Sequence, residues 1–209
     1  MPRQNRVTPL SSIIATPERG RWLGNRGCLH DESGRIRRLY QSRRWIICLL
    51  QFKGVRRELM QPGRWTELFF LDEATAFAAG HRPCSYCQRA RYEEFRALWA
   101  MANFDIVSNP KPGADEIDSR LHLERLDAHR NRITFIEPVA ALPDGTFVVY
   151  DGDPHLVSGS RLWHWHPGGY DRSIPSPTDA QLPVLTPRSV VKCLAQGFTV
   201  QIDPSAMSS

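Results

Sequence analysis

The sequence predicts an α+β protein: a small mixed sheet with helices, followed by an antiparallel β-meander and a C-terminal helix. Two observations carry this prediction. Short apolar runs alternate with helix-like stretches as far as residue 103, and closely spaced strand-like runs follow over residues 132–165. With 209 residues, 41% of them hydrophobic, the chain is long enough to bury a core without disulfide bonds.

Prolines divide the chain into three parts. Residues 1–20 contain three prolines and are expected to form a flexible arm, with a short strand at 12–15. Pro110 and Pro112 mark a boundary between a first portion, residues 21–107, and an α+β portion with the meander, residues 114–209. We expect the two portions to pack as one unit.

The first portion shows strand signals before its helices. Strands are expected at 45–52, 57–60 and 66–71. Asp72 is a suitable N-cap for a helix over 73–79, and Gly80 would end that helix. The clearest helix spans 89–103, where Phe95, Leu98 and Trp99 lie on one face.

The second portion is predicted to be mainly antiparallel. A helix is expected over 116–129 and a last one from Pro187 to Ala195, ended by Gly197. The strands of this portion are expected at 132–136, 146–150, 155–157, 161–165 and 198–202. The proline-rich stretch 174–187 is expected to be irregular.

Basic residues are concentrated near the N-terminus. Residues 1–60 hold 13 Lys and Arg against 4 Asp and Glu, a net charge of +9. Guanidinium groups suit phosphate oxygens, so these arginines form either a nucleic-acid surface, with DNA favoured over RNA, or a solvated basic face. The candidate nucleic-acid ligands are Arg35, Arg37, Arg38, Arg43, Arg44, Arg56 and Arg57.

The sequence contains neither a membrane-spanning run nor a signal-peptide core after its N-terminus. We therefore expect a cytoplasmic protein that does not bind membranes. Its five cysteines are irregularly spaced, which argues against a disulfide framework and leaves metal binding or simple burial for each thiol.

A Cys-x-x-Cys follows the predicted helix 73–79 through a glycine and a proline. Cys84 and Cys87 lie three residues apart, so a tight turn at the start of the next helix directs both sulfurs to one point. This spacing predicts half of a metal site, with Zn²⁺ as the ion.

The residues around this pair resemble a known zinc module. Phe70, Glu73-Ala74, Ala78-Ala79-Gly80, Arg82-Pro83-Cys84 and Cys87 resemble the second half of the Ada-type metal-binding domain. That domain belongs to bacterial adaptive-response proteins that repair methyl phosphotriesters in DNA. The resemblance covers residues 69–87 and extends loosely back to Trp45. It implies a zinc-binding role related to DNA repair or regulation.

The sequence departs from the family where two further cysteines are expected. Residues 53–64 contain none, and His81 replaces an aromatic residue. Cys28 and His30 are our first candidates for the remaining ligands, in a closed Cys3His tetrahedron. Cys48 and His81 are alternates, although Cys48 in an apolar strand is also typical of a small buried hydrophobe.

The family's chemistry is methyl transfer to a zinc-bound cysteine. A Cys3His shell carries less negative charge than four thiolates, which makes its sulfur a weaker nucleophile. We therefore favour a structural zinc over a methyl-accepting one. If methyl transfer does occur, Cys28 is the candidate acceptor.

A zinc hydrolase or nucleobase deaminase is the alternative. His30-Asp31-Glu32 followed by Pro83-Cys84-Ser85-Tyr86-Cys87 satisfies the His-x-Glu…Pro-Cys-x-x-Cys pattern of the deaminases, in which Glu32 would move the protons. The 50 residues between Glu32 and Pro83 exceed the usual spacing. The Ada-type resemblance is preferred.

A third candidate site is the strand 161–165. Strand alternation places Trp163 and Trp165 on one face and His164 and His166 on the other. The histidine pair, together with His155, has the residue types for a metal, phosphate or catalytic site. A half-buried strand that directs its tryptophans inward explains the same pattern.

Overall fold

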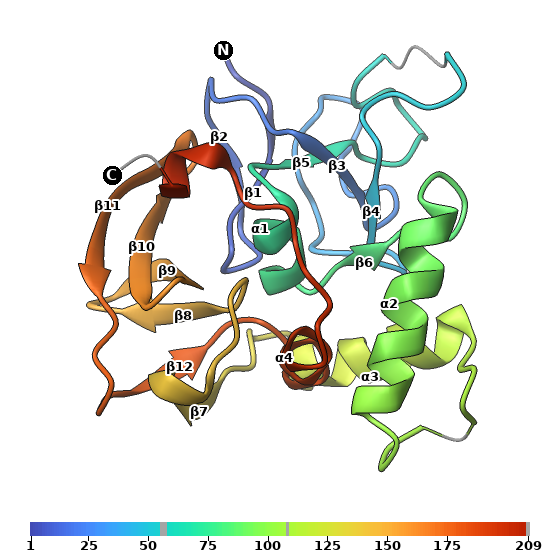
Figure 1. Ribbon diagram of the computed structural model, residues 1–209. Coiled ribbons are helices and arrows are strands. Elements are labelled where there is room, and N and C mark those ends of the chain that lie inside the picture. Colours follow the sequence, from blue (N-terminus) through green and yellow to red (C-terminus); the bar gives the residue numbers. More distant parts are fainter. Residues whose placement is uncertain (55–57, 108, 208–209) are drawn as a thin grey trace.

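The computed structural model describes residues 1–54, 58–107 and 109–207. Over these residues it contains two six-stranded sheets and four α-helices (Figure 1). The first sheet is mixed, the second is antiparallel, and a helix lies near the C-terminus. The predicted α+β class is confirmed. None of the described helices combines the length and the apolar composition needed to span a bilayer.

The first sheet is built from short strands in the order β2-β1-β5-β3-β4-β6. Its strands are β1 (Gln4–Val7), β2 (Ile13–Ala15), β3 (Trp22–Asn25), β4 (Ile46–Cys48), β5 (Leu68–Phe70) and β6 (Arg82–Pro83). The pairs β1–β5 and β4–β6 are parallel. The short strand expected at 12–15 is therefore present as β2. The expected partner strand 57–60 begins outside the described residues.

The first 20 residues contribute two strands to this sheet, whereas the sequence suggests a flexible arm. Val7 pairs with Ile13, and both side chains are buried. Burial of these apolar residues against the first core offsets the entropy lost on ordering the segment. The prolines lie outside the two strands and leave the pairing intact.

Helix α1 (Glu73–Ala78) lies between the two halves of the molecule (Figure 1). Asp72 caps the helix by accepting a 2.8 Å hydrogen bond from the Thr75 N–H. All six helical residues are buried. Phe77 belongs to the core of the first half, whereas Ala74 and Ala78 pack with the tryptophans of the second sheet. Small side chains on that face let the sheet approach closely.

Two further helices cover the first half. They are α2 (Arg89–Ala102) and α3 (Ala114–Arg125). Helix α2 buries Tyr92, Phe95 and Trp99, in agreement with its predicted apolar stripe. Helix α3 ends four residues before the predicted end. Leu126 is already extended and forms an isolated bridge with Arg132.

The second sheet has the strand order β11-β10-β9-β8-β12-β7. Its strands are β7 (Phe135–Pro138), β8 (Phe147–Tyr150), β9 (Asp153–Ser158), β10 (Arg161–His166), β11 (Gly169–Pro175) and β12 (Gln181–Val184). Strands β8, β9 and β10 form the expected meander, and β11 extends it. Strand β7, expected as its first strand, pairs with β12 instead. Strand β12 lies within the stretch expected to be irregular. It pairs with β8 only through Val184 and Val148, so Pro183 interrupts little of the ladder on that side.

The chain ends with helix α4 (Arg188–Ala195) and an extended segment. Residues 198–202, expected to form a strand, have no strand pairing in the described part of the chain. They run along the start of α1 instead. There the Gln201 N–H donates to Glu73, and the Gln201 carbonyl accepts from the Glu73 N–H. Short 3₁₀ turns occupy Val139–Ala141 and Pro204–Met207.

Candidate metal centre

Three thiols meet where β4 and β6 end. Cys48 is the last residue of β4, and Cys84 and Cys87 lie in the turn between β6 and α2. Their sulfur atoms all lie within 4.8 Å of one another. Among the described residues this is the one group of three or more Cys, His, Asp or Glu with ligand atoms this close. The three cysteines can therefore hold a metal ion.

Parallel pairing of β4 with β6 brings the third cysteine to the turn. Ile46 pairs with Arg82 and Ile47 with Pro83, so Cys48 follows in register with Cys84. The Cys84 N–H donates to the Ile47 carbonyl over 2.9 Å. The Gln88 side-chain amide donates to the same carbonyl over 2.7 Å. These two hydrogen bonds fix the turn against the end of β4.

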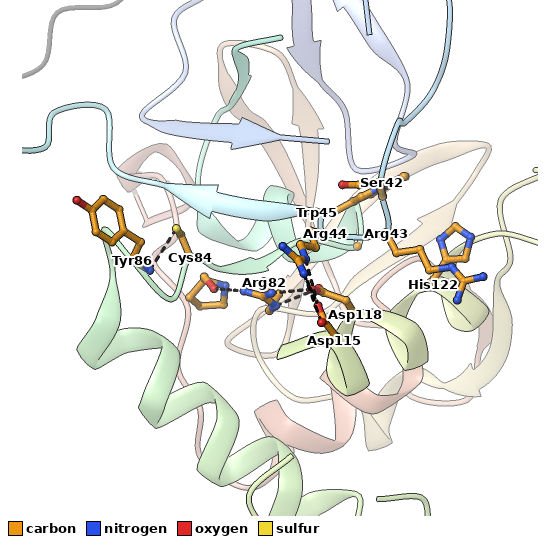
Figure 2. A network of polar contacts seen from close by, with 12 residues as sticks. Ser42, Arg43, Arg44, Trp45, Arg82, Cys84, Tyr86, Asp115, Asp118 and His122 are labelled. Carbon is orange, nitrogen blue, oxygen red and sulfur yellow. Dashed lines mark hydrogen bonds and ion pairs between the residues drawn. The ribbon is translucent and has the colours of Figure 1, made fainter. Parts of the chain in front are cut away.

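The turn also supplies N–H donors to sulfur. The Tyr86 N–H lies 3.4 Å from the Cys84 sulfur. Figure 2 draws this contact as a dashed line. Hydrogen bonds from the thiols of Cys48 and Cys87, helped by backbone N–H groups of Cys87 and Tyr86, lower the pKa of Cys84 far below its ordinary value. The same contacts, together with burial, raise the pKa of Cys48. A thiol whose pKa is lowered in this way is readily deprotonated, and the thiolate is the form that binds a cation.

The surroundings of the thiols are apolar on one side and open on the other. Cys48 and Cys84 are buried in a small cluster with Leu23. Cys87 is half-buried, and Tyr86 beside it is 69% exposed. Lys53 donates a 3.3 Å hydrogen bond to the Tyr86 hydroxyl. The buried side strengthens electrostatic attraction to a cation, and the open side gives a path for its entry.

A fourth ligand of the usual protein types is missing from the group. No further Cys, His, Asp or Glu of the described residues joins the three thiols. The rest of the sequence, residues 55–57, 108 and 208–209, contains only valine, arginine and serine. A tetrahedral ion held here would have three thiolates and a fourth position for a ligand from outside this set.

Cys28 and His30 are not members of the thiol group, and Cys48, the alternate, takes their place. Their loop is held elsewhere: the Cys28 N–H donates to Gln41, and the Leu29 N–H donates to Thr66. Both ring nitrogens of His30 have partners. One lies 2.6 Å from the Thr66 hydroxyl and the other 3.2 Å from the Gln61 carbonyl. These bonds satisfy His30 as a structural histidine.

His81, the second alternate, also has another role. It is fully buried, and its Nε2 accepts a 3.1 Å hydrogen bond from Arg26. Burial, followed by repulsion from Arg26 and Arg125, lowers the pKa of His81. As a neutral ring, His81 can accept the hydrogen bond from Arg26. This structural role accounts for a histidine here without a metal ion.

Glu32, the proton carrier of the deaminase alternative, is exposed on the turn that follows His30. Neither Glu32 nor His30 belongs to the thiol group.

Strand β10, which carries His164 and His166, follows its predicted pattern in part. Trp163 and Trp165 are buried in the core of the second half, whereas a register shift follows His164. His166 Nδ1 accepts a 3.2 Å hydrogen bond from the Gly168 N–H.

Five of the candidate nucleic-acid arginines lie among the described residues, where all five are exposed and some are paired. Arg37 contacts Asp31 at 2.6 Å, and Arg44 contacts Asp115 at 3.0 Å, the latter pair visible in Figure 2. Three others, Arg35, Arg38 and Arg43, are exposed without an ion pair to any described residue. Arg56 and Arg57 lie outside the described residues.

Comparisons of this chain with protein-family models, with curated proteins and with solved structures found no match.

Proposed function

We propose that this chain is a zinc-binding protein whose ion is held by Cys48, Cys84 and Cys87. The observation that carries the proposal is the convergence of the three sulfurs within 4.8 Å. Thiolates are soft ligands that select Zn²⁺ among the common divalent ions of the cell. The Ada-type resemblance of residues 69–87 supports the same ion, because Cys48 ends the strand that the resemblance places ahead of the first ligands.

The ion is proposed to act mainly as a structural tie. It would join the end of β4 to the turn before α2, two segments 36 residues apart in sequence. An ion that cross-links such segments stabilises the folded chain by its binding free energy, since the unfolded chain does not hold the three thiols together.

Elemental analysis of protein purified without chelators tests the metal. We expect about one zinc ion per chain, lost in Cys48→Ser and in Cys87→Ser. Cys193→Ser and Cys28→Ser are the controls, because Cys193 is buried beside the Phe95 carbonyl and Cys28 is outside the thiol group. Protein without metal, or metal retained in Cys48→Ser, would contradict the proposal. Another metal in place of zinc would contradict the choice of ion.

We further propose that the exposed arginines contact nucleic acid, with DNA preferred. Arg35, Arg38 and Arg43 support this role because they keep their charge in solvent with no acidic partner among the described residues. Arg44 lies ahead of β4, whereas the thiols lie at its far end. The arginines and the ion are therefore proposed to act separately, one in binding and the other in folding.

Fluorescence anisotropy with labelled duplex DNA at several salt concentrations tests this surface. We expect Arg35→Gln/Arg38→Gln/Arg43→Gln to weaken binding at least about tenfold and to reduce the salt dependence. Arg161→Gln/Arg188→Gln/Lys192→Gln, which removes the same charge far along the chain from residues 35–43, is the control. Equal weakening by the two variants would show that total charge, and not this surface, determines binding. Matched RNA in parallel tests the preference for DNA.

A further inference from the structure

Two histidines face each other on the second sheet, away from the thiols. His155 on β9 and His164 on β10 are directly paired in the antiparallel ladder. Their ring centroids are 5.2 Å apart. Cross-strand partners project from the same face of a sheet, so the two imidazoles lie side by side there.

Each imidazole is oriented through its Nδ1 atom. His155 Nδ1 lies 3.0 Å from the Asp153 backbone carbonyl, and His164 Nδ1 lies 2.7 Å from an Asp171 carboxylate oxygen. Both oxygens can only accept, so each Nδ1 carries the proton and each Nε2 keeps its lone pair when the ring is neutral. Histidines that bind metal ions are held in this way, with the outer nitrogen donating to a carbonyl or carboxylate.

A carboxylate lies close to the same point. The Asp153 Oδ2 atom is 3.6 Å from His164 Nε2, and the Asp153 side chain is 57% exposed. Beside it is a cavity of about 210 Å³, lined among others by Asp153, His155 and Arg172. Two imidazoles and one carboxylate form a nitrogen and oxygen ligand set of the type that divalent transition metals use.

The charge around the cavity also suits a cation. Asp151 and Asp153 line the cavity together with the single guanidinium of Arg172. Asp171, which accepts from His164, adds a third carboxylate nearby. The location is distinct from the thiol group, which lies on the first sheet.

We propose that His155, His164 and Asp153 form a second metal site, which binds a divalent transition metal such as Zn²⁺ or Ni²⁺. The two Nε2 atoms and the Asp153 carboxylate are its ligands, and its remaining positions open to the cavity. The exposed Asp153 side chain turns toward both rings to close the site. This rotation is required because, in the described part of the chain, only the thiols already lie together as three ligand atoms.

Calorimetric titration of Zn²⁺ into zinc-loaded full-length protein tests the site. We expect an additional equivalent of metal, bound with a dissociation constant in the micromolar range and weakened at least about tenfold by His155→Ala, His164→Ala and Asp153→Asn. His166→Ala is the matched control on the same strand and keeps the additional equivalent, since His166 Nδ1 already accepts from Gly168. No additional equivalent in the wild type, or one retained by both histidine variants, overturns the proposal.

Two features keep this test separate from folding and from the thiol centre. Asp153→Asn alters an exposed side chain, so unchanged affinity in this variant overturns the proposal even where a histidine variant fails to fold. Co²⁺ distinguishes the sites by spectrum. Thiolate-bound Co²⁺ shows strong sulfur-to-metal absorption, and the histidine site shows none. We expect Cys48→Ser to lose the sulfur-to-metal absorption band and still to bind the additional metal ion. This result would show that the thiol and histidine sites bind metal independently.

Discussion

The two ends of strand β4 lie beside chemically opposite groups: thiols at one end and arginine guanidinium groups at the other. At its C-terminal end, Cys48 meets two other thiols that can bind a cation. Just before its start, Trp45 packs against the guanidinium groups of Arg26 and Arg125, whose central carbons lie 3.9 and 4.1 Å from the centroid of the Trp45 ring. Both arginines are fully buried. The C-terminal end of β4 therefore lies in a cluster of sulfur ligands, and the N-terminal end lies beside two positively charged side chains.

The arginine end is satisfied mainly by neutral acceptors. Arg26 donates to His81 and to the Ser11 carbonyl, and Arg125 donates to the carbonyls of Gly80 and Arg43. Neither has a carboxylate partner within salt-bridge distance among the described residues. Burial lowers the pKa of Arg125 to about 9, so the group stays charged at neutral pH. The face of Trp45 stabilises the two charges through cation–π attraction.

The two ends of β4 differ in whether their charge can change. The thiols can exchange a proton for a metal ion, whereas the guanidinium groups stay positively charged. Thiols gain and lose protons, so their cluster can exist with or without a metal ion. Guanidinium groups keep their charge at neutral pH and need their acceptors at all times. Arginine content alone is a weak sign of nucleic-acid binding, because Arg26 and Arg125 contribute to the basic chain and yet have no exposed surface.

The largest effect is expected for Trp45→Leu. The change removes a buried indole, its 3.1 Å hydrogen bond to the Ser42 carbonyl and the aromatic face beside two cations. We expect a loss of about 5 kcal/mol in the free energy of unfolding, measured by urea denaturation. Trp45→Phe keeps an aromatic face and should lose clearly less. Equal losses in the two variants would mean that packing volume alone matters here.

The second-largest loss of stability is expected at Arg82, a buried arginine that does pair with a carboxylate. In Figure 2, Arg82 lies between the turn of Cys84 and the helix of Asp118. Arg82 donates to both Asp118 oxygens, at 3.0 and 2.6 Å, and both side chains are buried. Asp118→Asn leaves a buried charge without its counter-ion and should cost about 4 kcal/mol in the same assay.

Asp115→Asn is the matched control for this prediction. Asp115 lies on the same helix and pairs with Arg44, but both side chains are largely exposed. Solvent screening makes the expected cost less than about 0.5 kcal/mol. Similar losses in the two variants would show that burial does not set the strength of these pairs.

Short-range patterns predicted much of the fold, and a long-range pairing determined the site. The apolar stripe of Phe95 and Trp99 and the cap at Asp72 are local signals, and both predicted real helices. Cys84 and Cys87 were found by their spacing. The place of Cys48 depends on parallel pairing of β4 with β6, which no local pattern contains. In sequence, Cys48 has the same surroundings as any small buried residue.

Chelation of the zinc ion proposed for the thiol cluster is expected to have an intermediate effect. With free zinc at about 100 times its dissociation constant, bound metal stabilises the folded state by about 2.7 kcal/mol. Removal of the ion should lower the melting temperature of the wild type and leave that of Cys48→Ser unchanged. Trp45→Phe should lose the same free energy of unfolding with and without metal, because its end of β4 holds no exchangeable partner. If the stability loss of Trp45→Phe disappeared when the metal was chelated, the two ends of β4 would be energetically coupled.

The smallest effect is expected for Tyr86→Ala, which opens the exposed side of the thiol cluster. Tyr86 is 69% exposed and contacts Phe52 through rings 5.2 Å apart, so its removal should change the free energy of unfolding by less than about 1 kcal/mol. The neighbouring Cys87 is only half-buried, and its alkylation in metal-free protein should become several-fold faster. Ser85→Ala on the same turn is the control and should change neither quantity. An unchanged rate in Tyr86→Ala would mean that the reagent reaches the thiols from a different side, and that the opening beside Tyr86 is not the route by which the proposed ion would enter.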